Sequence, residues 1–215
     1  MDPATKVCEA IERETGGRAL AIEVSVTNKA QVERTVRQAV EVFGRIDILV
    51  NCAGILRPRP FLDFPEADWD AVFAVNVKGT FLFSQAVGRQ MIKQGGGGSI
   101  INISSASGMK ADREESAYCA SKSAINGLTR CIALELGPFG IRANGICPGA
   151  TDTKMLRDLC SGIPGLFDEL KEKTVLGRIA TPRDQANVAL FLASDLSAHV
   201  TGESIIVSGG ELMGQ

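Results

Sequence analysis

Residues 46–51 read Ile46-Asp47-Ile48-Leu49-Val50-Asn51, a short and almost wholly apolar run. Such a run is typical of a strand that is buried on both faces of a parallel sheet. Further apolar runs follow at 99–104, 141–147 and 204–207. The alternating, β-rich residues 19–26 predict one more strand ahead of them. We therefore expect these segments to form the sheet around which the chain folds.

Helical patterns separate the expected strands. Asp2 is a suitable N-cap for a helix that begins at Pro3 and ends near 16–17. Thr27 or Asn28 can cap a second helix, which ends at Gly44. Further helices are expected at 67–94, 116–137 and 182–194, and the amphipathic residues 151–175 predict either a mobile flap or a surface helix pair. This alternation predicts an α/β fold with a parallel sheet and helices on both faces, in one domain over 1–215.

Composition excludes several classes of protein. The chain has 215 residues, 45% of them hydrophobic, and a net charge of −2 without a basic block, which argues against nucleic-acid binding. No apolar run reaches the ~18 residues of a membrane span, and no signal peptide is visible, so we expect a cytoplasmic protein. The six cysteines show no Cys-x-x-Cys spacing and His199 is the only histidine, so we expect no metal site.

Tyr118, the only tyrosine, lies in Ser116-Ala117-Tyr118-Cys119-Ala120-Ser121-Lys122. Residues four apart share a helix face, and a neighbouring ammonium group lowers the pKa of a phenol. The strand expected just upstream ends in the hydroxyls of Ser104 and Ser105. A hydroxyl, a phenol and a lysine together predict a proton-transfer site. The alternative is an ordinary amphipathic helix in which the tyrosine packs and the lysine is solvated.

Five segments in one order and spacing resemble the short-chain dehydrogenase/reductase family over nearly the whole chain. They are Asn51-Cys52-Ala53-Gly54, Asn76-Val77, Ser105, Tyr118-x-x-x-Lys122 and Pro148-Gly149-Ala150-Thr151-Asp152-Thr153. The resemblance implies a Rossmann-type, doubly wound sheet. It also implies an NAD- or NADP-dependent oxidoreductase that interconverts a secondary alcohol and a ketone by hydride transfer.

The resemblance assigns catalytic roles to four residues. Tyr118 would be the general acid in reduction and the general base in oxidation, and Ser105 would hydrogen-bond the substrate oxygen. Lys122 would bind the nicotinamide ribose and lower the pKa of Tyr118, and Asn76 would help to hold a relay water. Each has an alternative: Ser104 is an equal candidate on composition, and Asn76 could cap or kink its helix.

The resemblance also implies a set of cofactor-binding residues. They are Ser25, Val26, Asn51, Ala53, Gly54, Tyr118, Lys122, Pro148, Gly149, Thr151 and Thr153. Two positions depart from the family pattern. Ser25 stands where an aspartate near the adenine ring is usual, and Cys52 stands where a second asparagine is usual. We expect Cys52 to pack, and the segments at 51–54 and 148–153 could also be plain turns.

The family's glycine-rich turn, Gly-x-x-x-Gly-x-Gly, is not found in this sequence. The run Gly95–Gly98 precedes a strand, so it has the wrong context. Relative to the family the chain would begin after the second strand, lacking ~30 residues or more, the size of one βαβ unit. The choice between NAD and NADP is then unreadable, and residues 46–51 would have an exposed edge. We expect either a working oxidoreductase or a truncated, silent chain that cannot bind the dinucleotide.

Other readings concern the substrate and the assembly. An acyl-transfer enzyme built on Ser105 is disfavoured, because no Gly-x-Ser-x-Gly or Ser-x-x-Lys context surrounds it. The preferred substrate is a small or medium alcohol/carbonyl pair, with no nucleic-acid or membrane partner. The resemblance implies a homotetramer or dimer, with interfaces on the helices at 67–94 and 116–137 and on the last strand.

Overall fold

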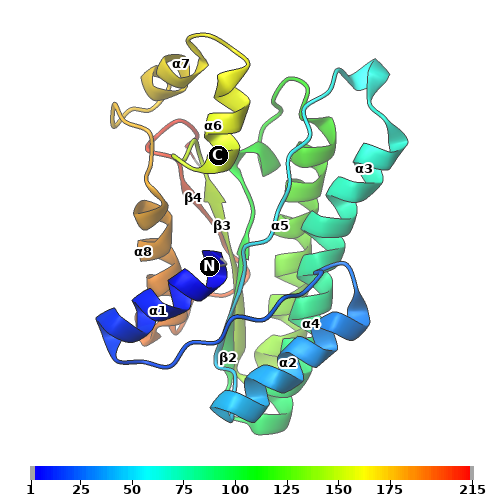
Figure 1. Cartoon of the computed structure of the whole chain (residues 1–215), viewed down its shortest axis with the longest axis vertical. Helices are drawn as coiled ribbons and strands as arrows, with labels where there is room; N and C mark the ends of the chain where they lie inside the picture. Colours follow the sequence, from blue (N-terminus) through cyan, green and yellow to red (C-terminus); the bar gives the residue numbers. More distant parts are fainter. Residues whose placement is uncertain (1–2, 214–215) are drawn as a thin grey trace.

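The computed structural model, in which residues 3–213 are described, is built around a four-stranded parallel sheet (Figure 1). Its strands lie side by side in chain order: β1 (Ile48–Asn51), β2 (Gly98–Ile103), β3 (Ile141–Pro148) and β4 (Ser204–Val207). All neighbouring strands are parallel, so their carboxyl ends meet at one edge of the sheet. The four apolar runs predicted as strands from 46 onward are confirmed.

Helices cover both faces of the sheet, as predicted. Figure 1 shows α2 (Lys29–Phe43), α4 (Thr80–Gln94) and α5 (Ser116–Leu136) on one side of the sheet. On the other side lie α1 (Pro3–Thr15) and α8 (Pro182–Ala193). The predicted Asn28 caps α2 by accepting a hydrogen bond from the Gln31 N–H. The predicted Asp2 cap of α1 lies outside the described residues.

Two apolar clusters hold these layers together. On the first face, Ile100 of β2 and Ile141 of β3 pack against Val87 and Met91 of α4. On the second face, Ile101 and Ile146 pack against Leu192 of α8. Consecutive residues of a strand point to opposite faces, which is why Ile100 and Ile101 enter different clusters. This alternation explains why β2 carries apolar residues on both of its faces.

The long helix predicted at 67–94 is divided in the structure. It comprises α3 (Glu66–Phe73), a π-helical segment (Ala74–Gly79) and α4. Wide π turns of this kind are rare and occur frequently at functional sites. Residues 151–175 form α6 (Lys154–Ser161) and α7 (Leu166–Glu172), which is the helix-pair alternative. No described helix is long and apolar enough to cross a membrane.

The strand predicted at 19–26 is wrong, because this segment has no strand structure. It lacks a neighbour to pair with: β1 is an edge strand, hydrogen-bonded only to β2 in the sheet. Local contacts hold the segment instead, as the Ser25 N–H donates to Gln31 Oε1 at 2.7 Å. The outer edge of β1 therefore stays open, and Val50 is 44% exposed. This confirms the exposed apolar edge expected for residues 46–51.

Candidate active site

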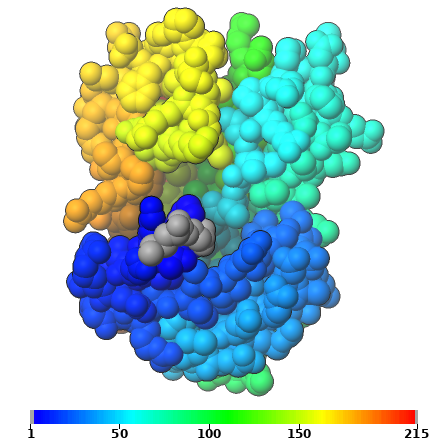
Figure 2. Space-filling view, in the orientation of Figure 1, coloured from blue at the N-terminus to red at the C-terminus, as the bar shows by residue number. Residues whose placement is uncertain are grey.

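Ser105 and Tyr118 meet at the carboxyl edge of the sheet. Ser105 follows β2 in an extended conformation, and Tyr118 lies in the first turn of α5. The Ser105 hydroxyl lies close enough to the Tyr118 phenol to lower the pKa of that phenol, and its Oγ accepts the Ser107 N–H at 3.1 Å. Figure 2 shows the surface hollowed between the yellow helices of residues 154–172 and the cyan segment beyond β1. The arrangement places the two hydroxyl groups beside each other at this edge of the sheet.

Ser104 has a different task from its neighbour. It is buried, and its Oγ donates to the backbone carbonyl of Lys122 at 2.9 Å. The loop after β2 approaches α5 so closely that a Cβ at Gly108 would lie 2.9 Å from the Lys122 carbonyl carbon. Ser104 thus anchors α5 to the end of β2, while Ser105 reaches Tyr118. Of the two serines, the structure brings Ser105 to the tyrosine.

Lys122 is buried one turn along α5 from Tyr118, with only 4% of the residue exposed. Its Nζ donates to the Ile103 carbonyl oxygen at 2.8 Å and lies 5.4 Å from the centroid of the Tyr118 ring. Burial lowers the pKa of Lys122 to about 8, because the charged form is poorly solvated there. The alternative of a solvated lysine is therefore wrong.

The pKa of Tyr118 departs from the prediction. Burial raises it to about 12, the hydrogen bond from Ser105 lowers it, and Glu115 and Asp112 raise it further. The predicted lowering by Lys122 is wrong in this structure. Desolvation penalises the phenolate more than the surrounding groups stabilise it. The Lys122 ammonium is held by the Ile103 carbonyl oxygen instead. The spacing of Tyr118 and Lys122 in the sequence carries no information on burial.

Asn76 lies in the π-helical segment and is completely buried. Its Oδ1 accepts the Ile55 N–H at 2.8 Å, and its Nδ2 donates to the Ile55 carbonyl at 3.0 Å and to Ser121 Oγ at 3.0 Å. The side chain therefore ties the loop after β1 to α5. This agrees with the helix-distortion alternative, and its contact with a relay water stays a prediction.

Asn51, at the end of β1, belongs to a buried polar row that sequence reasoning missed. Its Nδ2 donates to Asn102 Oδ1 at 2.8 Å and to Ser84 Oγ at 3.0 Å. Asn102 in turn donates to Thr129 Oγ1 at 2.9 Å. The row links β1, β2, α4 and α5. The available signal was Asn102 itself, an amide inside an otherwise isoleucine-rich buried strand.

The chain beyond Asn51 passes directly beside the lysine. A Cβ at Gly54 would lie 3.5 Å from Lys122 Nζ and 3.6 Å from Asn76 Oδ1. Cys52, which was expected to pack, is exposed, so that prediction is wrong. The reason is the open edge of β1, which leaves no element to cover it. The segment of Ala53 and Gly54 thus leads from the sheet edge to the buried Lys122.

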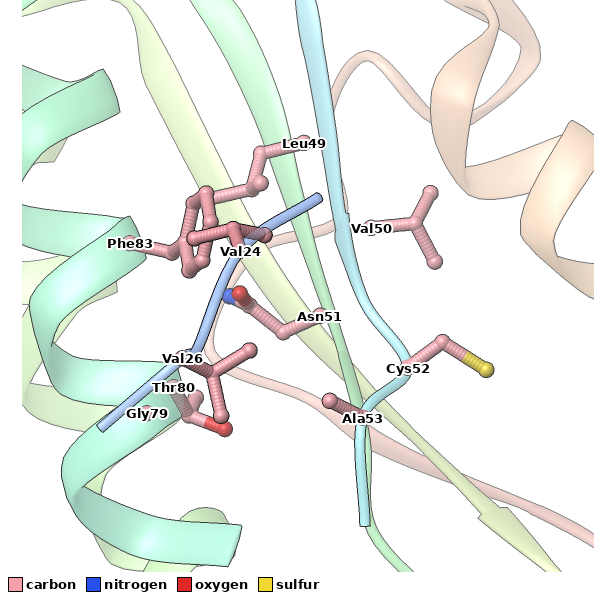
Figure 3. A pocket seen from close by; sticks show the side chains of 10 residues that line it. All are labelled: Val24, Val26, Leu49, Val50, Asn51, Cys52, Ala53, Gly79, Thr80 and Phe83. Carbon is pink, nitrogen blue, oxygen red and sulfur yellow. The ribbon is translucent and has the colours of Figure 1, made fainter. Parts of the chain in front are cut away.

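A groove of about 240 Å³ lies between the 24–26 segment and β1. Its lining residues are Val24, Val26, Leu49, Val50, Asn51, Cys52, Ala53, Gly79, Thr80 and Phe83. Figure 3 shows Val24 and Phe83 facing Leu49, whereas Val50 and Cys52 point away from them. Three predicted cofactor residues, Val26, Asn51 and Ala53, meet here. Ser25 does not: it lines a separate hollow with Gln31 and Arg34.

The loop after β3 holds the last predicted cofactor residues. Thr151 Oγ1 donates to the Gly149 carbonyl at 3.0 Å and accepts from Gln185 Nε2 at 3.1 Å. Thr153 caps α6 by accepting the Leu156 N–H. Pro148 ends β3. The loop is therefore a fixed turn at the same sheet edge as Ser105, which places it within the candidate site.

A cluster of titratable side chains lies at the N-terminal end of α5. Asp112, Glu115 and Cys119 have possible ligand atoms within 4.8 Å of one another, the one such trio among residues 3–213. Burial raises the pKa of Glu115 to about 7, the Asp112 carboxylate adds to this, and Lys110 opposes it. These groups also raise the pKa of Tyr118. The Glu115 carboxyl group, whose pKa is about 7, thus lies beside the candidate site.

Comparisons with known proteins agree on one family. A family model described as Enoyl-(Acyl carrier protein) reductase matches residues 1–211. The Short-chain reductase protein NovJ of Streptomyces niveus is 41% identical over 96% of this chain and 79% of its own. The NAD-dependent glycerol dehydrogenase of Listeria innocua is 38% identical over 90% of this chain and 75% of its own.

Solved structures show the same likeness. A gluconate 5-dehydrogenase from Burkholderia cenocepacia, solved in complex with NADP and tartrate, superposes with a TM-score of 0.90 at 36% sequence identity. The match covers 97% of this chain and 80% of that one. The described strands and helices therefore keep the arrangement of a solved dehydrogenase over nearly their whole extent.

Proposed function

Because the chain belongs to the short-chain dehydrogenase/reductase family, we propose that Tyr118 transfers the proton in its reaction. The protein is an NAD(P)-dependent oxidoreductase that acts on CH–OH groups, interconverting a secondary alcohol and a ketone. The observation that carries the proposal is the position of the buried Lys122, whose Nζ lies 5.4 Å from the centroid of the Tyr118 ring, one helical turn away and beside the end of β2 that leads into Ser105.

Tyr118 and Ser105 act on the oxygen of the substrate. In reduction the phenol of Tyr118 gives its proton to the carbonyl oxygen as the carbon is reduced, and in oxidation it takes the proton back. Ser105 donates a hydrogen bond to the same oxygen. The Ser107 N–H, which donates to Ser105 Oγ at 3.1 Å, fixes the direction of that hydroxyl. A fixed donor stabilises developing charge without reorganising.

A nicotinamide nucleotide supplies or accepts the hydride when it is bound. The residues present fit it: the backbone at Gly54 passes beside Lys122, where a Cβ would lie 3.5 Å from Nζ, and the 148–153 loop lies at the same sheet edge. We assign Lys122 to the ribose hydroxyls of the nucleotide. Asn51, Ala53 and Gly54 would line the nucleotide on the β1 side. Pro148, Gly149, Thr151 and Thr153 would line it on the β3 side. Ser25 and Val26 would lie toward the adenine, and Asn76 beside a relay water. The cofactor is NAD or NADP.

We further propose a homo-oligomer, a dimer or tetramer, that works in the cytoplasm on a small or medium alcohol/carbonyl pair. Large apolar side chains stand exposed on the two long helices: Phe81 on α4 is 43% exposed and Leu134 on α5 is 80% exposed. Such side chains mark interaction surfaces when they gather. The six cysteines are all free, as is usual in a reducing compartment.

Titration with NADH and with NADPH tests the proposal. Folding is first confirmed by circular dichroism, and binding is then followed by nucleotide fluorescence. We expect saturable binding of at least one nucleotide, and the better ligand identifies the cofactor. Lys122→Ala should weaken that binding at least tenfold, because the ribose loses its charged partner. A folded chain that binds neither nucleotide would contradict the proposal and support the silent alternative.

A further inference from the structure

Glu211 is a buried carboxylate in the segment that follows β4. Only 7% of its side chain is exposed, although it carries a charge. The segment is closed into a turn, in which Ser208 Oγ donates to the Leu212 carbonyl at 3.0 Å and accepts the Leu212 N–H at 3.1 Å. A buried carboxylate is expensive unless it is paired and hydrogen-bonded. The groups that pair with the Glu211 carboxylate therefore indicate what its burial achieves.

One oxygen of Glu211 reaches the loop after β3. Its Oε2 accepts the Ala150 N–H at 3.3 Å. A Cβ at Gly149 would lie 2.8 Å from this same oxygen and 2.7 Å from Ser208 Cβ, so only glycine allows the approach. Gly149, one of the predicted cofactor-binding residues, is thus needed for contact with Glu211. The carboxylate fixes the position of that loop.

The other oxygen of Glu211 begins a chain of contacts toward the proton-transfer site. Oε1 accepts from Lys110 Nζ at 2.8 Å, and the same ammonium lies 3.1 Å from Asp112 Oδ1. Asp112 Oδ2 accepts from Ser107 Oγ at 2.8 Å. Ser107 in turn donates its backbone N–H to Ser105 Oγ. An unbroken polar path thus runs from the end of β4 to the hydroxyl that contacts Tyr118.

We propose that Glu211 is a positioning residue of the reaction, which acts through Lys110, Asp112 and Ser107 to hold the Ser105 hydroxyl against Tyr118. The inference rests on the proposed function. Glu211 has no contact with Tyr118 itself, but it joins the loops after β2, β3 and β4 at one carboxylate. Without the Glu211 charge, the half-buried Lys110 ammonium keeps Asp112 alone as its ion-pair partner. Lys110 would then no longer tie the loop that carries Ser105 to the segment after β4.

The central test is Glu211→Gln, which keeps the shape and removes the charge. We expect kcat for the reaction to fall at least tenfold, while the nucleotide Kd changes less than threefold. Glu33→Gln, which removes an exposed ion pair with Lys29 on α2, is the matched control and should keep wild-type kcat. A Glu211→Gln variant within twofold of wild-type kcat would overturn the proposal.

A second readout does not need activity. Because Tyr118 is the only tyrosine, protein labelled with [¹³C]tyrosine gives one ring resonance that reports the Ser105 contact. We expect Glu211→Gln to shift this resonance and Glu33→Gln to leave it unchanged. If the wild-type chain binds no nucleotide, this shift still supports the positioning role, and an unshifted resonance overturns it. If Glu211→Gln fails to fold, Lys110→Met combined with Glu211→Gln removes both charges. A folded double variant with the wild-type resonance would then refute the proposal.

Discussion

At the scale of single residues, the proposed proton transfer depends on Tyr118 and Ser105. Tyr118→Phe removes one hydroxyl and keeps the buried ring, so we expect the turnover number to fall by about 10²- to 10⁴-fold. The melting temperature should change little. The measurement is the steady-state rate with the better nucleotide, beside a thermal unfolding curve. Activity above a tenth of the wild-type value would contradict the acid/base role.

The Glu115 carboxyl group makes the stability of the folded protein depend on pH. Its pKa is raised from 4.5 to about 7, so the folded protein binds more protons than the unfolded chain between these values. The free energy of unfolding should therefore fall as the pH rises from 4.5 to 7. Glu115→Gln removes this loss and should be more stable than wild type at pH 8, by about 1 to 2 kcal/mol after allowance for solvent screening.

Urea denaturation at pH 5 and pH 8 measures this difference. Glu115→Gln should match wild type at pH 5 and exceed it at pH 8. The matched control is Glu33→Gln on the exposed face of α2, which should follow the wild-type pH dependence. A Glu115→Gln variant whose advantage is the same at both pH values would show that the carboxyl group does not titrate as described.

The sequence indicated which residues form the candidate site better than it indicated their burial and pKa. Tyr118, Lys122 and Ser105 could be read from motif spacing, because the spacing fixes which side chains share a helix face. The pKa of Tyr118 could not, since it depends on burial by elements far away in the chain. Asn102 was missed for the same reason: its partners, Asn51 and Thr129, become neighbours only when β1, β2 and α5 pack.

At the scale of elements, α8 begins with a complete capping box. Thr181 Oγ1 accepts the Asp184 N–H, and Asp184 Oδ2 accepts the Thr181 N–H at 2.7 Å. Thr181→Ala removes the cap and should lower the free energy of unfolding by about 1 kcal/mol. Equilibrium urea denaturation measures this, with Thr5→Ala on α1 as the control. A loss equal to that of the control would contradict the capping role.

Elements with strong local signals were predictable from sequence. The N-cap Asn28 and the spacing of Val32 and Val36 defined α2, and Pro182 marked the start of α8. The segment 19–26 was not predictable in this way, because a strand forms only where a neighbour pairs with it. The π-helical segment at 74–79 also has no visible signal in the residue pattern; its side-chain contacts with the Ile55 backbone are long-range.

At the scale of the whole molecule, assembly is the property to measure. If α5 lies in a subunit interface, Leu134→Glu should move the protein from an oligomer to a smaller species in size-exclusion chromatography with light scattering. The charge would be buried without a partner in the assembled form. Leu196→Glu is the matched control, because Leu196 is 82% exposed but lies outside α4 and α5. An unchanged mass for Leu134→Glu would contradict this interface.

The open edge of β1 has a consequence for how the protein behaves when it is concentrated. A free strand edge is a template on which another chain can add a strand, and the product of such growth is an aggregate. This edge is only four residues long, and the ion pair between Arg45 and Asp47, at 2.7 Å, stands beside its start. Charges next to an apolar edge act as gatekeepers against edge-to-edge growth. High salt screens those charges, so a concentrated sample should aggregate faster as ionic strength rises.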